Sequence, residues 1–153
     1  MLDIIRQEDY HRVMVFANMK VTVKQLADRL RRRHNSVDCL HGDMPQSQRN
    51  RVMAKFRQNQ LEILVATDVA ARGIDVEDVE AVFNYDIPDE NEYYTHRIGR
   101  TGRAKRQGSA YTFMTEEDKF RIRDILKYTR SEATRMVFDD RRRLIPYVEP
   151  TEE

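Results

Sequence analysis

Arginines and glycines alternate between His96 and Arg103, where the sequence is HRIGRTGR. An arginine side chain is always charged, and its planar guanidinium presents several donors that fit phosphate oxygens. Glycine has no Cβ, so a ligand can approach the backbone closely. From His96 to Arg106 the chain has five lysines or arginines and no acidic residue. This segment therefore predicts a site for concentrated negative charge, such as a phosphate group.

Three other segments carry polar side chains where a strand is expected to end or a helix to begin. They are VFAN at residues 15–18, QSQR at 46–49, and ATDVAARGID at 66–75. The short apolar runs of the chain predict five strands, at residues 12–17, 37–40, 62–67, 80–85 and 109–113. Residues spaced three and four apart predict helices between and after the strands, with stripes at residues 23–30, 49–56 and 122–126; the second stripe is apolar except for Arg49.

Strands that consist of continuous apolar runs and alternate with helices are typical of an α/β domain. Such a domain has a mainly parallel sheet with helices on both faces. Ligands of these sheets bind at the carboxyl ends of the strands. We therefore expect the polar segments to meet at this edge.

Several helices carry expected caps at their first residues. Thr22 with Gln25, and Asp43 with Gln46, have the spacing of a capping box. Gln46 stays open between this capping role and a second, functional one. Thr67 and Thr115 are also expected at N-cap positions.

Composition restricts the class of protein. The 153 residues are 40% hydrophobic and 35% charged, which fits one globular domain with a core of its own. The net charge of +1 excludes a uniformly basic coat, so a polyanion site must be a local patch. Cys39 is the one cysteine and cannot form an internal disulfide, which favours a reducing, cytoplasmic setting. No apolar stretch approaches membrane length.

The last part of the chain differs in pattern from the rest. We expect the domain to occupy residues 1–128 and a C-terminal extension, partly disordered, to occupy residues 129–153. The extension carries Pro146 and Pro150 and lacks clear periodicity. Its Arg141-Arg142-Arg143 follows two aspartates, and such a mixed run is usually a solvated surface.

The polar segments together, in this order, resemble the second RecA-like domain of the DEAD-box RNA helicases. The resemblance covers roughly the first three quarters of the chain. VFAN and QSQR are weak signals alone, whereas ARGID (71–75) and HRIGRTGR are strong ones. The resemblance implies a RecA-like fold and the C-terminal core domain of an ATP-dependent RNA helicase.

The resemblance also implies roles in a nucleotide site. Arg100 and Arg103 would face the γ-phosphate of ATP, with Arg103 as the arginine finger that stabilises charge during phosphoryl transfer. Gly73 would let the backbone approach the nucleotide, and Asp75 would accept hydrogen bonds from the ribose hydroxyls. His96 would couple the segment to the partner domain. Arg72 and Arg97 would lie at the interface with that domain.

RNA contacts are implied at other positions on the same edge. Asn18, Gly42, Arg49 and Thr67 would contact the sugar-phosphate backbone. Most of these are short or backbone donors, and Arg49 supplies a guanidinium. Such a set binds phosphates and ribose rather than base edges, so we expect binding that tolerates any RNA sequence.

Part of the helicase machinery is missing from the sequence. The P-loop pattern Gly-x4-Gly-Lys-Ser/Thr, which cradles the phosphates of ATP, does not occur in the sequence. No apolar run leads directly into the acidic stretch 89–92, so this stretch is not the strand-end magnesium site. We expect an N-terminal RecA-like domain of the same protein to hold ATP and Mg²⁺, and this chain to have no metal site of its own.

Two other functions stay open at this point. The chain could be a non-catalytic module that binds RNA or a protein through the same scaffold, since a fold does not fix a function. It could also be a DNA-directed relative in the wider helicase superfamily. An upstream P-loop and acidic motif would separate the helicase from the binding module.

Overall fold

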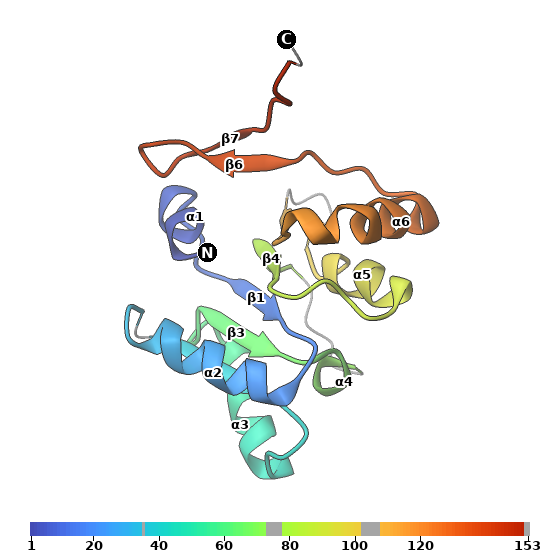
Figure 1. Ribbon diagram of the computed structural model, residues 1–153. Coiled ribbons are helices and arrows are strands. Elements are labelled where there is room, and N and C mark those ends of the chain that lie inside the picture. Colours follow the sequence, from blue (N-terminus) through green and yellow to red (C-terminus); the bar gives the residue numbers. More distant parts are fainter. Residues whose placement is uncertain (35, 73–77, 102–107, 152–153) are drawn as a thin grey trace.

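Five parallel strands form the centre of the fold in the computed structural model, which describes residues 1–34, 36–72, 78–101 and 108–151 (Figure 1). Their order across the sheet is β2-β3-β1-β4-β5. They are β1 (Val13–Phe16), β2 (Val37–Leu40), β3 (Ile63–Ala66), β4 (Ala81–Asn84) and β5 (Ser109–Thr112). All five predicted strands are confirmed, as is the RecA-like α/β class.

Each strand of the sheet's centre is buried on both faces. One face packs against α3 (Gln46–Arg57) and α4 (Asp68–Ala71), and receives Met14 and Phe16 of β1. The other face packs against α1 (Leu2–Gln7) and α2 (Lys20–Arg31), and receives Val13 and Val15. Successive side chains of a strand point to opposite faces. A sheet covered on both faces therefore needs the continuous apolar runs that the sequence shows.

The register of the strands aligns their carboxyl ends. Phe16 lies opposite Ala66 of β3 and Asn84 of β4, and Leu40 lies opposite Ala66. The chain therefore leaves β1, β2, β3 and β4 at one edge of the sheet. Residues that directly follow these strands are brought close together there.

Two of the predicted helix caps are wrong. Helix α2 begins at Lys20, with Met19 at the N-cap, so Thr22 lies inside the first turn. Helix α3 begins at Gln46, with Pro45 at the N-cap and no side-chain cap. Asp43 pairs instead with Lys20 of α2, at 3.1 Å, and the hydrogen bond from Lys20 lowers the pKa of the Asp43 carboxyl.

Helix α5 (Asn91–Ile98) was not predicted from the sequence. Its buried side chains are Tyr94 and Arg97, and these two residues do not form an apolar stripe in the sequence. Arg121 of α6 (Lys119–Thr129) fixes the start of α5. The Arg121 guanidinium donates to Asn91 Oδ1 at 2.6 Å and to the Pro88 carbonyl at 3.2 Å.

The C-terminal part of the chain forms a hairpin for which the sequence predicted no element. Thr115 and Asp118 make the capping box of a 3₁₀ turn, η1 (Glu116–Asp118), that leads into α6. After α6, β6 (Met136–Phe138) pairs with β7 (Leu144–Pro146) in an antiparallel hairpin that crosses above α1 (Figure 1). Leu144 packs against the core on the α1 side, and Gln7 donates to the Arg142 carbonyl at 2.6 Å.

Among the helices that the structure describes, none is both long and apolar enough to cross a membrane. The division into a domain (1–128) and an extension (129–153) stays a prediction.

Candidate functional site

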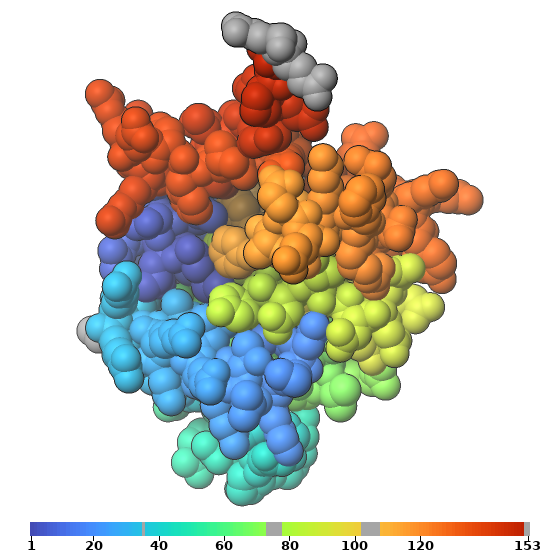
Figure 2. Space-filling view, in the orientation of Figure 1, coloured from blue at the N-terminus to red at the C-terminus, as the bar shows by residue number. Residues whose placement is uncertain are grey.

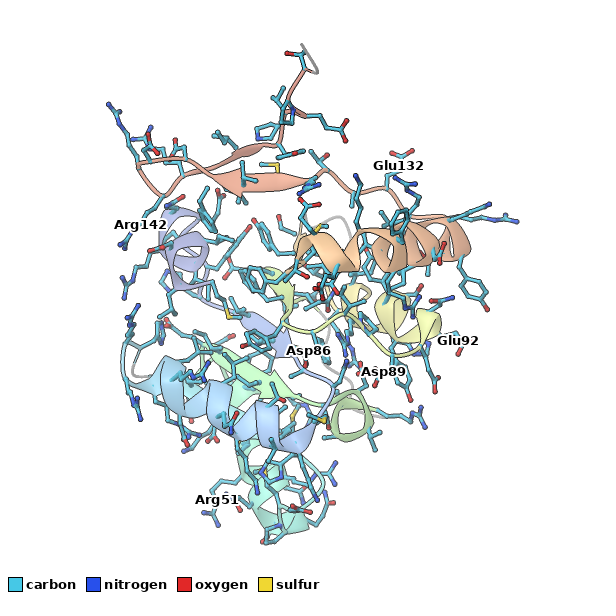
Figure 3. All side chains as sticks on the ribbon, in the orientation of Figure 1. Arg51, Asp86, Asp89, Glu92, Glu132 and Arg142 are labelled. Atoms are coloured by element: carbon cyan, nitrogen blue, oxygen red, sulfur yellow. The ribbon has the colours of Figure 1, made fainter. Side chains whose placement is uncertain are left out.

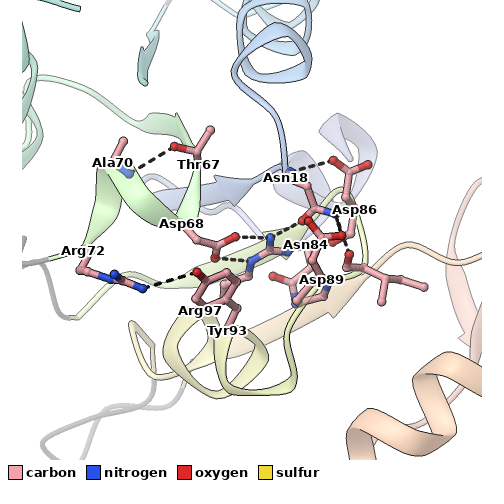
Figure 4. Close-up of polar contacts among 12 residues, drawn as sticks. Asn18, Thr67, Asp68, Ala70, Arg72, Asn84, Asp86, Asp89, Tyr93 and Arg97 are labelled. Carbon is pink, nitrogen blue, oxygen red and sulfur yellow. Dashed lines mark hydrogen bonds and ion pairs between the residues drawn. The ribbon is translucent and has the colours of Figure 1, made fainter. Parts of the chain in front are cut away.

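Three of the four predicted polar segments, together with the loop after β4, meet at the carboxyl edge of the sheet. Asn18 follows β1, Thr67 and Asp68 follow β3, and Asp86 follows β4. Arg97 reaches them from the last turn of α5. Figure 4 shows these side chains converging from three strand ends and one helix.

Arg97 is the most deeply buried charged residue of this group, and the exposed fraction of its side chain is 0%. Its Nε and Nη2 donate to the two oxygens of Asp68 at 2.7 and 2.6 Å. Its Nη1 donates to the Asp86 carbonyl at 2.8 Å, and its Nη2 also donates to Asn18 Oδ1 at 2.7 Å. A planar guanidinium can donate several hydrogen bonds in fixed directions at once, which a lysine ammonium cannot do. All three nitrogens of the Arg97 guanidinium thus donate to groups within this domain. The expected contact of Arg97 with another domain stays a prediction.

Asn18 connects the end of β1 to the loop after β4. Its side-chain amide donates to the Ile87 carbonyl at 2.9 Å and to Asp89 Oδ1 at 3.3 Å. Its backbone amide donates to Asp86 Oδ2 at 2.9 Å. The Asn18 side chain therefore fixes the loop on which α5 depends.

Thr67 caps α4, as predicted. Its Oγ1 accepts a hydrogen bond from the Ala70 amide at 3.2 Å. The threonine is 9% exposed, so little of it reaches the surface. A helix of four residues cannot stabilise itself, and this cap together with the Asp68–Arg97 pair holds it in place.

Two arginines with different expected ligands lie against the end of α4. Arg49 of α3, expected at RNA, donates to the Ala70 carbonyl at 3.2 Å. Arg100, expected at ATP, donates to the Ala71 carbonyl at 3.0 Å. The unpaired carbonyls at a helix C-terminus carry partial negative charge and suit cations. One turn of helix therefore lies between the two expected ligand sites.

A cavity of about 240 Å³ opens beside this turn. Arg72 lies at its rim, where Nη2 is 3.4 Å from the Tyr93 hydroxyl. His96 is exposed and also lines the cavity. The full lining is Phe16, Asp68, Ala71, Arg72, Tyr93, His96, Arg97 and Arg100. Since Asp68 is already paired with Arg97, the polar groups that line the cavity are mainly donors, which suit an anionic ligand.

Gly42 lies in the exposed turn after β2. A Cβ added at Gly42 would meet no atom within 4 Å, so the backbone there is open to a ligand. The neighbouring His41 is buried, and its Nδ1 accepts from the Asp43 amide at 3.3 Å. Burial, aided by the nearby Lys24 charge, lowers the pKa of the His41 ring, which favours the neutral form that accepts this bond.

Three expected site residues, Gly73, Asp75 and Arg103, lie outside the described residues. In the part of the chain that is described, no group of three or more histidine, cysteine or carboxylate side chains could hold a metal ion.

Several residues of the site were not predicted from the sequence. They are Asp68, Asp86 and Tyr93. One signal was present: β4 ends in Asn84, a polar residue in an apolar run, and the structure buries it completely. Its side-chain amide donates to Thr112 Oγ1 at 3.0 Å and links β4 to β5 beside the site.

Comparisons with known proteins agree with this geometry. Residues 1–105 match the family described as helicase conserved C-terminal domain. The ATP-dependent RNA helicase FAL1 of Candida glabrata is 45% identical over 126 residues, which cover 82% of this chain and 32% of that protein. The chain thus spans about a third of the length of the curated relatives it matches.

Solved structures show the same fold. The E. coli DEAD-box protein SrmB, bound to regulator of ribonuclease activity A, has a TM-score of 0.83 at 35% identity, over 99% of this chain and 88% of that one. S. cerevisiae Dbp5, bound to RNA and ADP BeF3, has a TM-score of 0.74 at 34% identity, over 82% of this chain and 34% of that one. The chain belongs to the helicase conserved C-terminal domain family, in its DEAD-box branch.

Proposed function

We propose that this chain is the C-terminal half of the core of an ATP-dependent RNA helicase. Relatives at 45% identity carry that name, and Dbp5 is described with RNA and a nucleotide bound together. The observation that carries the proposal is the turn α4. It places Arg49 and Arg100, the guanidiniums expected at RNA and at ATP, on adjacent carbonyls.

The nucleotide side of the proposal rests on the donors at the cavity. Arg72, His96 and Arg100 line a space whose one carboxylate is already neutralised. These donors fit the phosphates of ATP, which when bound supplies the phosphoryl group for transfer. Arg100 and Arg103 would stabilise the negative charge of the γ-phosphate, and His96 would couple this segment to the N-terminal domain. Gly73 and Asp75 would hold the ribose.

The RNA side of the proposal uses donors along the same edge. The Gly42 backbone is open, and Arg49 is partly exposed beside α4. These groups would hold phosphates, and Thr67 and Asn18 would lie against the ribose-phosphate backbone. Since backbone and short polar donors with one guanidinium suit phosphates and ribose rather than base edges, binding would tolerate any RNA sequence.

The partner in catalysis would be an N-terminal RecA-like domain of the same protein. That domain would supply the P-loop and hold Mg²⁺, because this sequence contains no P-loop. Arg72, which lies exposed at the cavity rim, would face it. Arg97 would act on the interface through the helix that it fixes.

The test is RNA-stimulated ATP hydrolysis by this chain alone and by the chain joined to the P-loop domain that we propose precedes it. We expect no turnover alone and an RNA-dependent rate in the joined protein. Arg100→Ala and Arg103→Ala should each lower that rate, and loss of an arginine finger costs about 10³-fold or more. Arg32→Gln, on the far end of α2, is the control and should leave the rate unchanged.

Two results would contradict the proposal. One is turnover by the chain alone that is lost in Arg103→Ala, since the chain would then need no second domain; turnover that survives Arg103→Ala would come from a contaminating enzyme and would be discounted. Absence of turnover in the joined protein would favour a non-catalytic binding module instead.

A further inference from the structure

Helix α3 differs in charge from every other helix that the structure describes. From Met44 to Leu61 the sequence has four lysines or arginines and no acidic residue. Each of the other described helices contains at least one aspartate or glutamate. A solvated helix face usually interleaves charges of both signs. The charged residues of α3 are therefore all cationic, and such a surface attracts anions.

Burial divides α3 into two sides. Val52, Met53 and Phe56 are buried against the sheet. The opposite side, which we call the basic face, is exposed and carries Arg51 and Lys55. The other exposed side chains of the helix are neutral or basic, namely Gln46, Ser47, Gln48, Asn50, Ala54 and Arg57. Cations with neutral amide and hydroxyl groups form the set that contacts nucleic-acid backbones.

The basic face has no counter-charge among the described residues. No described carboxylate forms an ion pair with Arg51, Lys55 or Arg57, whereas the α2 cations Lys20 and Arg31 pair with Asp43 and Asp28. Arg51 and Lys55 are four residues apart and so lie in one row on the helix. Like charges at this spacing repel each other, and an external anion between them would relieve the repulsion.

The helix connects the expected RNA edge to the opposite edge of the sheet. In its first turn, Arg49 contacts the Ala70 carbonyl at the carboxyl edge. At its end, the Phe56 carbonyl accepts a hydrogen bond from Arg12, which directly precedes β1, at 2.6 Å. Twelve residues of α-helix span about 18 Å. In Figure 2, α3 projects at the lower end of the molecule, and Figure 3 shows Arg51 pointing away from the body of the protein.

We propose that the basic face of α3 is a second RNA-binding surface, which holds the phosphate backbone of the strand beyond the contact at Arg49. The proposal rests on the proposed function, because it assumes RNA at Arg49. Arg51 and Lys55 would each neutralise one phosphate. Binding there would depend on strand length and on salt, and would not depend on base sequence.

The test compares double variants of this chain in binding to fluorescein-labelled single-stranded oligouridylate by anisotropy, over a series of KCl concentrations. For a long oligomer we expect Arg51→Gln/Lys55→Gln to lower the slope of log affinity against log salt by about 0.7 for each phosphate that is no longer neutralised. A short oligomer that fills only the carboxyl edge should bind the variant and the wild type equally.

Arg29→Gln/Arg32→Gln on α2 is the matched control, because it removes the same charge from an exposed helix whose surface includes Asp28. It should leave the salt slope unchanged. If Arg51→Gln/Lys55→Gln behaves like this control, the basic face does not hold RNA. An acidic protein surface would then be the partner that the face fits.

Arg49→Gln separates failure of this inference from failure of the proposed function. Arg49→Gln should weaken both short and long oligomers. If neither oligomer binds the wild-type chain, or if Arg49→Gln changes nothing, the RNA site itself is contradicted. If Arg49→Gln weakens both and Arg51→Gln/Lys55→Gln weakens neither, only the second surface is contradicted.

Discussion

Arg97 shows how one buried side chain organises the site. Its three donor groups bind Asp68, Asp86 and Asn18, which come from the ends of three different strands. A buried ion pair is weak evidence for net stability, because desolvation of both charges opposes their attraction. Its geometric effect is clear, since it fixes α5 relative to α4 and so sets where Arg100 lies.

Removal of the Arg97 guanidinium should be costly, because Asp68 would keep its charge without a partner. The exposed fraction of the Asp68 side chain is only 12%. We expect Arg97→Ala to lower the free energy of unfolding by about 3–5 kcal/mol. Urea unfolding at neutral pH measures this change.

Arg72→Ala is the control for that experiment. Arg72 is exposed and makes one long contact, to Tyr93, so its loss should change the unfolding free energy by about 0.5 kcal/mol or less. Equal effects of Arg97→Ala and Arg72→Ala would show that the buried network does not stabilise the domain.

His11 gives the domain a pH dependence at the edge opposite the site. Its Nδ1 lies 2.9 Å from Glu62 Oε1, and its Nε2 lies 3.0 Å from Asp9 Oδ1. The hydrogen bond to Glu62, together with the Asp9 charge, raises the pKa of the His11 ring. A raised pKa in the folded state means that the stabilisation is fully present below the unfolded value and is lost as pH rises through the folded one.

We therefore expect His11→Gln to destabilise the domain more at acidic pH than at alkaline pH. The stabilisation by His11 is lost as pH rises through its folded-state pKa, which lies above the ordinary histidine value of about 6.5. Urea unfolding of both proteins at about pH 5.5 and about pH 8.5 brackets that value. In a Glu62→Gln background the difference should shrink. A difference that grows with pH would contradict the ion-pair explanation.

At the scale of elements, the five strands of the parallel sheet could be predicted, whereas helix α5 and the C-terminal hairpin could not. Each strand of a doubly covered parallel sheet is apolar along its whole length, so β1 and β3 stand out in the sequence. Helix α5 buries Tyr94 and Arg97 instead of aliphatic side chains. Apolar periodicity cannot detect a helix whose buried face is held by an ion pair.

The caps show the same limit on a smaller scale. Thr67 and Thr115 were predicted correctly, since in both cases the helix starts directly after the capping residue. Asp43 was not, because Lys20 of a different helix competes for its carboxylate. Capping rules count spacing within one segment, whereas contacts between distant segments decide which partner an aspartate takes.

The convergence of polar segments at one edge of the sheet was predicted, but their side-chain pairing was not. Alignment of the strand ends follows from a parallel sheet, and it brings Asn18, Thr67 and Arg97 to one edge. The pairing of Arg97 with Asp68 spans 29 residues of sequence. Nothing in the spacing of either residue marks the other as its partner.

Helix α4 joins two parts of the candidate site. Its start is capped by Thr67, and its end accepts Arg49 on Ala70 and Arg100 on Ala71. A displacement of this single turn would therefore move both arginines together. This arrangement gives the two proposed ligands a short physical connection through one element.

At the scale of the whole molecule, the near-neutral net charge conceals an uneven distribution. The sequence has 27 lysines and arginines against 26 acidic residues. All charged residues of helix α3 are nevertheless cationic, while the stretch 86–92 carries four carboxylates. Local potentials, rather than the net charge, decide where a polyanion binds.

The C-terminal hairpin packs on the domain through Leu144, so its docking can be tested with single substitutions. Leu144 of β7 is half-buried against the core on the α1 side, whereas its neighbour Ile145 is 41% exposed. An isolated two-stranded hairpin is marginally stable in water, so the hairpin depends on this docking.

We expect Leu144→Ser to release the hairpin and Ile145→Ser, the matched control, to leave it in place. Limited proteolysis should then cut the Leu144→Ser chain between residues 130 and 143 faster than the wild type. Equal cleavage of both variants would mean that the Gln7–Arg142 contact and the Arg135–Glu116 pair hold the hairpin without Leu144.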